Sequence, residues 1–91
     1  MSSYKDLVNV VIKRELGILG VERMRGVLEA LNIPVNEAGH CLKEKCGMED
    51  LDQLMQELSS RYGAVAVMGC RIAVGRLARE ANLELPKILM S

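Results

Sequence analysis

Apolar residues recur at three- and four-residue steps over most of the chain, which is the spacing of one face of an α-helix. The first such stripe predicts a helix from about Ser3 to Glu15, with Ser3 as its N-cap and Asp6 three residues later. Gly17 and Gly20 follow, and they predict a break before the next helix. The stripe consists of Tyr4, Leu7, Val8, Val11, Ile12 and Leu16.

Two further helices are predicted by the same spacing. The second begins near Val21 and ends before Pro34, because proline disfavours helical geometry at the residue that precedes it. The third begins near Met48, and Gly63 closes or kinks it. Their apolar faces are Val21, Met24, Val27, Leu28 and Leu31 in the second helix, and Leu51, Leu54, Met55 and Leu58 in the third.

The segment 33–47, between these two helices, fits two different structures. It reads as a helix over residues 36–46 or as a small β-hairpin with its turn at residues 36–39. Gly39 would cost a helix interior roughly 1 kcal/mol relative to alanine, so we expect the hairpin or an irregular loop. The hairpin would pair Ile33 and Val35 with Cys41.

The segment from Ala64 to Ala81 is the most apolar part of the chain, and we expect it to form the central helix. Pro86 bounds it downstream, and the tail 83–91 is again strongly apolar. Small residues along this segment allow neighbouring backbones to approach closely. They are Ala66, Gly69, Ala73, Gly75 and Ala78.

Together these elements predict an all-α fold, or a mainly α fold with one small β-hairpin near 33–42. About four helices would pack orthogonally or as a bundle around the central apolar helix. The chain has 91 residues, of which 49% are hydrophobic, but it has no Phe or Trp. We therefore expect one domain over residues 1–91 whose single core is built from aliphatic side chains.

The charge balance and the cysteines narrow the function classes. Twelve basic and twelve acidic side chains cancel, so no net field draws the chain to nucleic acid or to an anionic membrane. The longest apolar run, Gly63 to Cys70, is far shorter than the roughly 20 residues of a membrane-spanning helix. Three cysteines cannot all pair within one chain, which fits a reducing compartment. We expect a cytoplasmic protein without membrane insertion.

His40, Cys41, Cys46 and Cys70 are residue types that bind zinc. Structural zinc sites usually use Cys-x2-4-Cys spacing, whereas Cys41 and Cys46 are five positions apart and would diverge by about 140° on a helix. Cys70 fits a small buried hydrophobe. We therefore expect no metal and no other cofactor, and if a metal were bound, His40, Cys41 and Cys46 would be its candidate ligands.

The adjacent pair His40 and Cys41 also raises the question of a catalytic cysteine. A cysteine nucleophile needs a base within hydrogen-bond reach, a group that orients the base, and an oxyanion site. The sequence shows none of these, and neighbouring residues point to different faces of a helix or strand. We expect no catalytic residues and no enzymatic activity.

Residues 27–43 are compatible with a helix-turn-helix motif. The second helix would then present Asn36, His40 and Lys43 to DNA, together with Glu37. Because attraction to phosphates supplies most non-specific DNA affinity, this surface would bind weakly. A small DNA-binding regulator is therefore an alternative rather than the first hypothesis, and a thiol-ligated metal or redox site is a third.

The first hypothesis comes from a surplus of apolar side chains beyond the needs of four short helices. The tail either covers its own core or docks into a groove of a neighbouring subunit. We expect a non-enzymatic protein–protein interaction module, either a homodimer or a subunit of a larger complex. The candidate partner-binding residues are Leu83, Leu85, Ile88, Leu89 and Met90.

Overall fold

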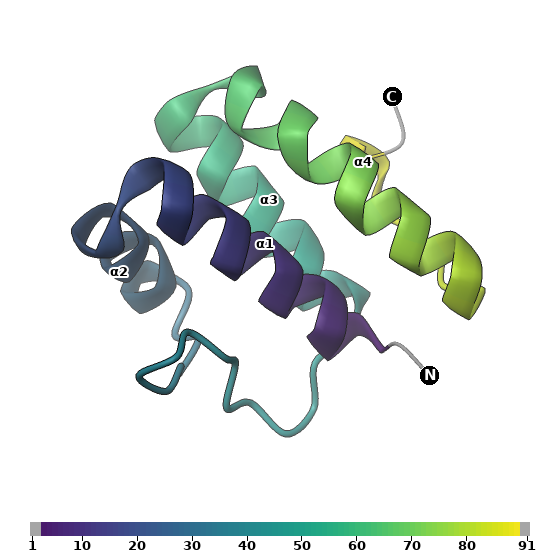
Figure 1. Cartoon of the computed structure of the whole chain (residues 1–91), viewed down its shortest axis with the longest axis horizontal. Helices are drawn as coiled ribbons and strands as arrows, with labels where there is room; N and C mark the ends of the chain where they lie inside the picture. Colours follow the sequence, from purple (N-terminus) through teal and green to yellow (C-terminus); the bar gives the residue numbers. More distant parts are fainter. Residues whose placement is uncertain (1–2, 90–91) are drawn as a thin grey trace.

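The structure, a computed structural model, describes residues 3–89 and shows four α-helices and one short 3-10 helix in that range (Figure 1). The predicted all-α class is confirmed, and no β-strand occurs among the described residues. The elements are α1 (Tyr4–Leu19), α2 (Val21–Ala30), α3 (Met48–Tyr62), α4 (Ala64–Ala81) and η1 (Lys87–Leu89).

Two helices form the centre of the fold. Helices α1 and α3 lie in the middle and each contacts the three other α-helices, while α2 lies on one flank and α4 on the other (Figure 1). The expectation that residues 64–81 form the central helix is therefore wrong. Helix α4 buries only one stripe of its surface, so its high apolar content does not place it inside the fold.

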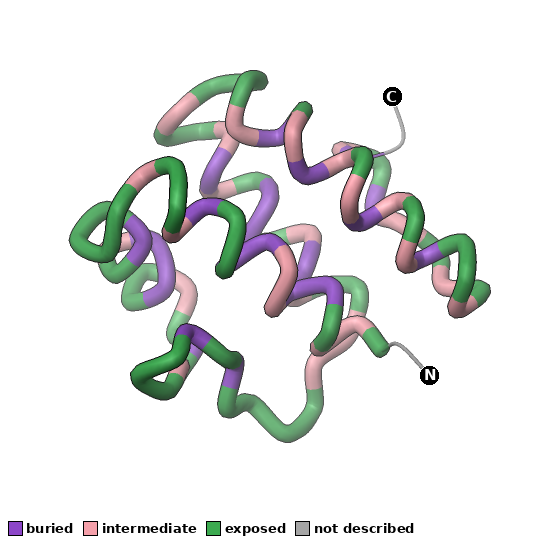
Figure 2. The backbone as a smooth tube through the Cα atoms, in the orientation of Figure 1, coloured by how far each residue is buried: buried purple, intermediate pink, exposed green. Residues whose placement is uncertain are grey.

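The core consists of the apolar stripes that the sequence predicts. Figure 2 shows the buried positions on the faces that the helices turn toward one another. Burying one such aliphatic side chain fully is worth roughly 2 kcal/mol, so the stripes supply most of the stability of the fold. The fully or nearly fully buried residues of the first three helices are Leu7, Val8, Val11, Ile12, Met24, Val27, Leu28, Leu51, Leu54, Met55 and Leu58.

Helix α1 extends four residues further than predicted. Gly17 lies inside the helix, and the chain leaves the helix only at Gly20, which has a φ of 90° and donates its N–H to the carbonyl of Leu16 at 3.1 Å. Gly63 forms the equivalent junction between α3 and α4, with a φ of 84°. Glycine adopts this left-handed geometry without the steric cost that a side chain would bring, so each junction joins two helices directly.

Acidic side chains stabilise the beginnings of α1 and α3. The predicted cap is confirmed, since the Ser3 N–H donates to Asp6 at 2.8 Å. Asp50 accepts the Gly47 N–H at 2.9 Å and forms an ion pair with Lys43. Burial acts to raise the pKa of Asp50, but the hydrogen bonds from Lys43 and Gly47 outweigh it and lower the pKa below its ordinary value.

The loop between α2 and α3 contains a single antiparallel β-bridge, which joins Val35 to Cys41 as the hairpin interpretation predicts. The Asn36 carboxamide oxygen accepts the N–H groups of Ala38 at 2.9 Å and His40 at 3.0 Å, so it holds the turn. The bridge is held by the Leu42 N–H, which donates to the Pro34 carbonyl at 2.7 Å, and it does not extend further because Pro34 has no N–H to donate back. The Cys41 N–H points away from Val35 and donates to the side chain of Asn9 on α1 at 2.7 Å. The loop is thus attached to α1.

Candidate functional site

The C-terminal tail packs on its own chain. Leu89 is 1% exposed, and η1 contacts both α3 and α4. The Tyr4 hydroxyl donates to the carbonyl of Glu84 at 2.7 Å, which attaches the tail to the first turn of α1. Of the five candidate partner-binding residues, Leu83, Leu85 and Ile88 are partly buried against the core, Leu89 is buried, and Met90 lies outside the described residues.

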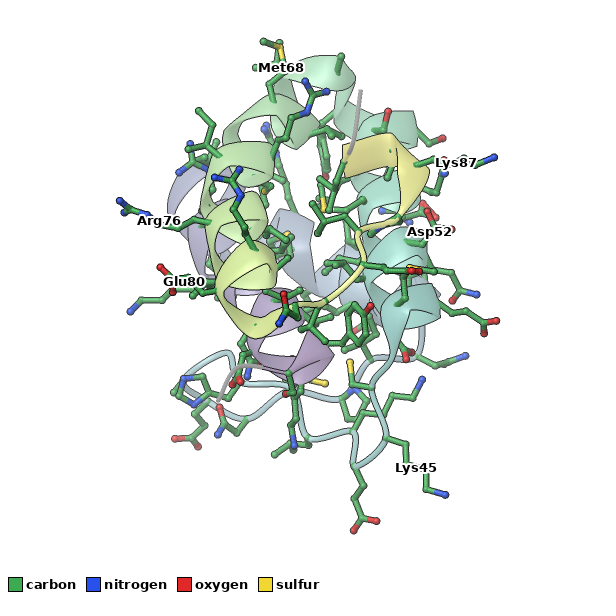
Figure 3. All side chains as sticks on the ribbon, turned by 90° about the vertical axis from the view of Figure 1, so that its right-hand side faces the viewer. Lys45, Asp52, Met68, Arg76, Glu80 and Lys87 are labelled. Atoms are coloured by element: carbon green, nitrogen blue, oxygen red, sulfur yellow. The ribbon has the colours of Figure 1, made fainter. Side chains whose placement is uncertain are left out.

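Exposed apolar side chains instead gather where the C-terminal end of α1 meets the N-terminal half of α4. Four large residues there are between 59% and 82% exposed. In Figure 3, Met68 extends away from the body of the molecule. We call this surface the α1–α4 patch, and it consists of Ile18, Val65, Met68 and Ile72.

The spacing of apolar residues on α4 explains the patch. The buried stripe of this helix is Val67, Cys70, Val74 and Ala78. Val65, Met68 and Ile72 also follow three- and four-residue steps, but their stripe lies on the outer face. Helix α4 is therefore apolar on two faces and buries only one of them.

A pocket of about 550 Å³ lies between α1 and α4 at the edge of this patch. Patch residues Ile18, Val65 and Met68 line it together with Leu19, Tyr62 and Ala66. Two charged residues, Arg14 and Glu15, also line it. We call it the Glu15 pocket.

Glu15 is the one buried charged or polar residue among the described residues, with 1% of its surface exposed. Its Oε1 accepts the Cys70 thiol at 3.2 Å, and its Oε2 has no hydrogen-bond partner among the described residues. The carboxylate lies in the last turns of α1, where the helix dipole is negative. A buried carboxylate with one weak donor is costly to the fold.

The Cys70 thiol is held in its protonated form. Burial, and then the hydrogen bond to Glu15, raises the pKa of Cys70 to about 12. Burial also raises the pKa of Cys46 to about 11. Because the thiolate is the reactive form of cysteine, neither environment activates the thiol as a nucleophile.

Arg14 crosses from α1 to α4 over Gly69. A Cβ at Gly69 would lie 2.5–3.0 Å from the guanidinium of Arg14, so the missing side chain provides the space in which this group lies. No ion pair joins Arg14 to Glu15 among the described residues. Arg14 also lines a second groove of about 820 Å³ on α4, together with Arg71, Arg76 and Arg79 but no acidic residue.

The loop places the candidate metal ligands only partly together. Cys41 is buried and interacts with the half-buried Cys46, whereas His40 is exposed. Within residues 3–89, no group of three His, Cys, Asp or Glu side chains is arranged to hold a metal ion.

The helix-turn-helix interpretation requires a second helix over residues 36–42, and the structure has a turn and a β-bridge there instead. Asn36 uses its side chain inside that turn, and Lys43 is paired with Asp50. The expected reading face of Asn36, His40 and Lys43 is therefore not on a helix.

Sequence reasoning missed Glu15, although a signal was present. Glu15 follows Val8, Val11 and Ile12 at helical spacing, so it lies within the apolar stripe of α1. A charged residue in that register is either at the edge of the buried face or a buried functional group. Only the structure distinguishes the two.

No protein-family model matches the sequence, and no significant match exists among curated proteins or solved structures. Among the helices that the structure describes, none is both long and apolar enough to cross a membrane.

Proposed function

We propose that the protein is a non-enzymatic protein–protein interaction module that self-associates through the α1–α4 patch. The observation that carries this proposal is the gathering of the exposed Ile18, Val65 and Met68 around one pocket, with the exposed Ile72 one turn further along α4. Scattered apolar residues are normal on a protein surface, whereas a contiguous group of large ones marks an interaction site.

The size of the patch favours a weak association. A two-fold dimer buries the patch of both copies, so up to eight such side chains contribute roughly 2 kcal/mol each, less the share that is already buried in the monomer. Association costs about 4–15 kcal/mol in lost translational and rotational freedom. The two quantities are comparable, so we expect a dimer whose population depends strongly on protein concentration.

The surface of α4 favours a two-fold, antiparallel arrangement of two copies. Ala73 follows Ile72, and Gly75 lies one turn beyond it with open space where a Cβ would be. Such small residues allow a second helix to approach closely. Arg76 and Arg79 lie in the C-terminal half of α4, and Arg71 lies near its middle. Antiparallel packing places this positive half against the apolar N-terminal half of the other copy, which limits repulsion between like charges.

The proposal is tested by light scattering across a concentration series under reducing conditions. We expect the wild-type mass to rise toward that of a dimer, and the rise to steepen with added salt because salt screens the arginines. Ile72→Asp and Met68→Asp should remain folded monomers.

The matched control is Leu42→Asp, because Leu42 is 54% exposed but lies on the loop, away from the patch. This variant should associate as the wild type does. A wild type that stays monomeric at every concentration, or patch variants that associate normally, would contradict self-association through this surface.

A further inference from the structure

We propose that the Glu15 pocket binds an aliphatic amine, with the protonated nitrogen donating to Oε2 of Glu15 and the alkyl chain lying against the apolar walls. This inference concerns a small-molecule site within one chain. It does not require self-association, but Ile18, Val65 and Met68 belong to both the pocket and the α1–α4 patch, so a dimer formed through the patch would cover the pocket.

The carboxylate selects the charge of the ligand. Glu15 lines the pocket and is almost completely buried, and its Oε2 is a buried atom with no donor among the described residues, so an ammonium group reaches it only when side chains of the pocket wall move aside. An ammonium group provides three donors and a positive charge, and hydrogen bonds between charged groups are about twice as strong as neutral ones. A carboxylate ligand would be repelled, and an alcohol would offer a single neutral donor.

The walls select the shape and polarity of the remainder of the ligand. The lining is apolar apart from Arg14 and Glu15, and it includes Leu19, Tyr62 and Ala66 from three helices. Its volume of about 550 Å³ lies within the range of small-molecule sites. An alkyl chain of several carbons matches this composition.

Arg14 does not occupy the place of the amine. Its guanidinium lies over Gly69, and no ion pair joins it to Glu15 among the described residues. Its positive charge at the same pocket opposes a cationic ligand, so a simple amine should bind modestly. The ratio of the amine affinity to the alcohol affinity therefore tests the role of Glu15 better than the absolute affinity of the amine does.

The first experiment compares three probes of equal chain length on the wild-type protein by NMR titration near neutral pH: n-hexylamine, 1-hexanol and hexanoate. We expect n-hexylamine to bind at least about tenfold more tightly than 1-hexanol, and hexanoate to bind weakest. Shifts should concentrate at Glu15, Ala66 and Gly69. Equal or tighter binding of 1-hexanol overturns the proposal, as does absence of n-hexylamine binding.

The second experiment removes the charge. Glu15→Gln should weaken n-hexylamine binding by about tenfold and leave 1-hexanol unchanged. The control is Glu22→Gln, because Glu22 is an exposed glutamate in the first turn of α2. Circular dichroism checks that both variants remain folded. An unchanged amine affinity in folded Glu15→Gln overturns the proposal.

If Glu15→Gln does not fold, a third variant still tests the proposal. Ala66→Leu fills the pocket and should abolish binding of both n-hexylamine and 1-hexanol, whereas Ala73→Leu lies on the same helix outside the pocket and should bind both. If Ala66→Leu still binds n-hexylamine, the amine does not bind in the Glu15 pocket and the proposal is overturned.

The Ile72→Asp variant separates this proposal from self-association, because Ile72 does not line the Glu15 pocket. Amine binding by this variant supports the pocket whether or not the wild type dimerises. If Ile72→Asp is folded and its pocket is otherwise unchanged but it no longer binds n-hexylamine, the proposal that one chain contains the whole site is overturned.

Discussion

Glu15 interrupts the apolar face of α1 with a charge that the described residues do not neutralise. Its neighbours in the same register, Val11 and Ile12, are completely buried. A leucine at this position would continue the stripe without leaving a carboxylate oxygen unpartnered. Residues that reduce stability in this way are typical of functional positions, because selection retains them for another reason.

We predict that Glu15→Leu stabilises the fold by on the order of 1–3 kcal/mol at neutral pH, because it removes a buried carboxylate and retains a similar volume. Urea unfolding measures the change, and Glu29→Leu on the exposed surface of α2 should change the free energy of unfolding by less than about 0.5 kcal/mol. A destabilised Glu15→Leu would mean that the carboxylate has a strong partner in solution.

Cys70 gives the fold a dependence on alkaline pH. A free thiol ionises near its ordinary pKa of 9.0, whereas the folded environment raises the pKa of Cys70 to about 12. As the pH rises above 9, the unfolded chain therefore loses the thiol proton before the folded chain does. The free energy of unfolding falls over this interval and is fully retained below it.

The corresponding prediction concerns Cys70→Ala, which should lose less stability than the wild type between about pH 7.5 and about pH 10.5. Urea unfolding at the two pH values provides the comparison. Val74→Ala removes a similarly buried side chain of α4 without a titratable group, and it should retain the wild-type pH dependence. If the stability of Cys70→Ala depends on pH as that of the wild type does, groups other than Cys70 cause the loss of stability at alkaline pH.

At the scale of elements, the tail acts as the cover of the groove between α3 and α4. Leu89 is buried at this groove, and η1 contacts both α3 and α4. The chain reaches it through Asn82, whose φ of 56° ends α4, and through a hydrogen bond from the Leu83 N–H to the Ala78 carbonyl at 2.8 Å.

We predict that Leu89→Ala lowers the free energy of unfolding by about 2–5 kcal/mol, because it leaves a cavity between the two helices. Thermal and urea unfolding measure the loss. Lys87→Ala, a change at an exposed residue of the same short helix, should be close to neutral. A neutral Leu89→Ala would show that the tail is not packed on the core in solution.

The sequence predicts the positions of the helices better than it predicts which face of each helix is buried. Hydrophobic spacing indicates all four helices, and Pro34 and Gly63 lie near the ends of two of them. The extension of α1 past Gly17 was missed because one glycine costs a helix only about 1 kcal/mol, which a packed residue such as Leu19 offsets.

The candidate site was much harder to predict. An apolar residue at helical spacing can be buried against a neighbouring helix or exposed to solvent. The sequence therefore did not indicate that Met68 and Ile72 are exposed while Val67 and Cys70 are buried, because this depends on how α4 packs. The tail posed the same problem, since its composition fits both a cover and a docking segment. The partner of each helix face is a property of the tertiary structure.

At the scale of the whole molecule, the position of α4 on a flank determines which surface is free. Helices α1 and α3 bury their stripes against three neighbours, whereas α4 covers them from one side and keeps its outer face exposed (Figure 1). The patch, the Glu15 pocket and the arginine-lined groove all lie on or beside this outer helix. In Figure 3, Arg76 and Met68 both extend outward from it.

The contact between Tyr4 and Glu84 has a consequence for synthesis of the chain on the ribosome. Of the described helices, α1 leaves the exit tunnel before the others, and the carbonyl of Glu84 that binds its Tyr4 hydroxyl is translated eighty positions later. Leu89, the neighbour of α3 and α4 in η1, follows shortly after. Until that neighbour emerges, the nascent domain exposes the groove between α3 and α4 to solvent and to chaperones. Native packing of the described residues is therefore completed only after the tail has left the exit tunnel.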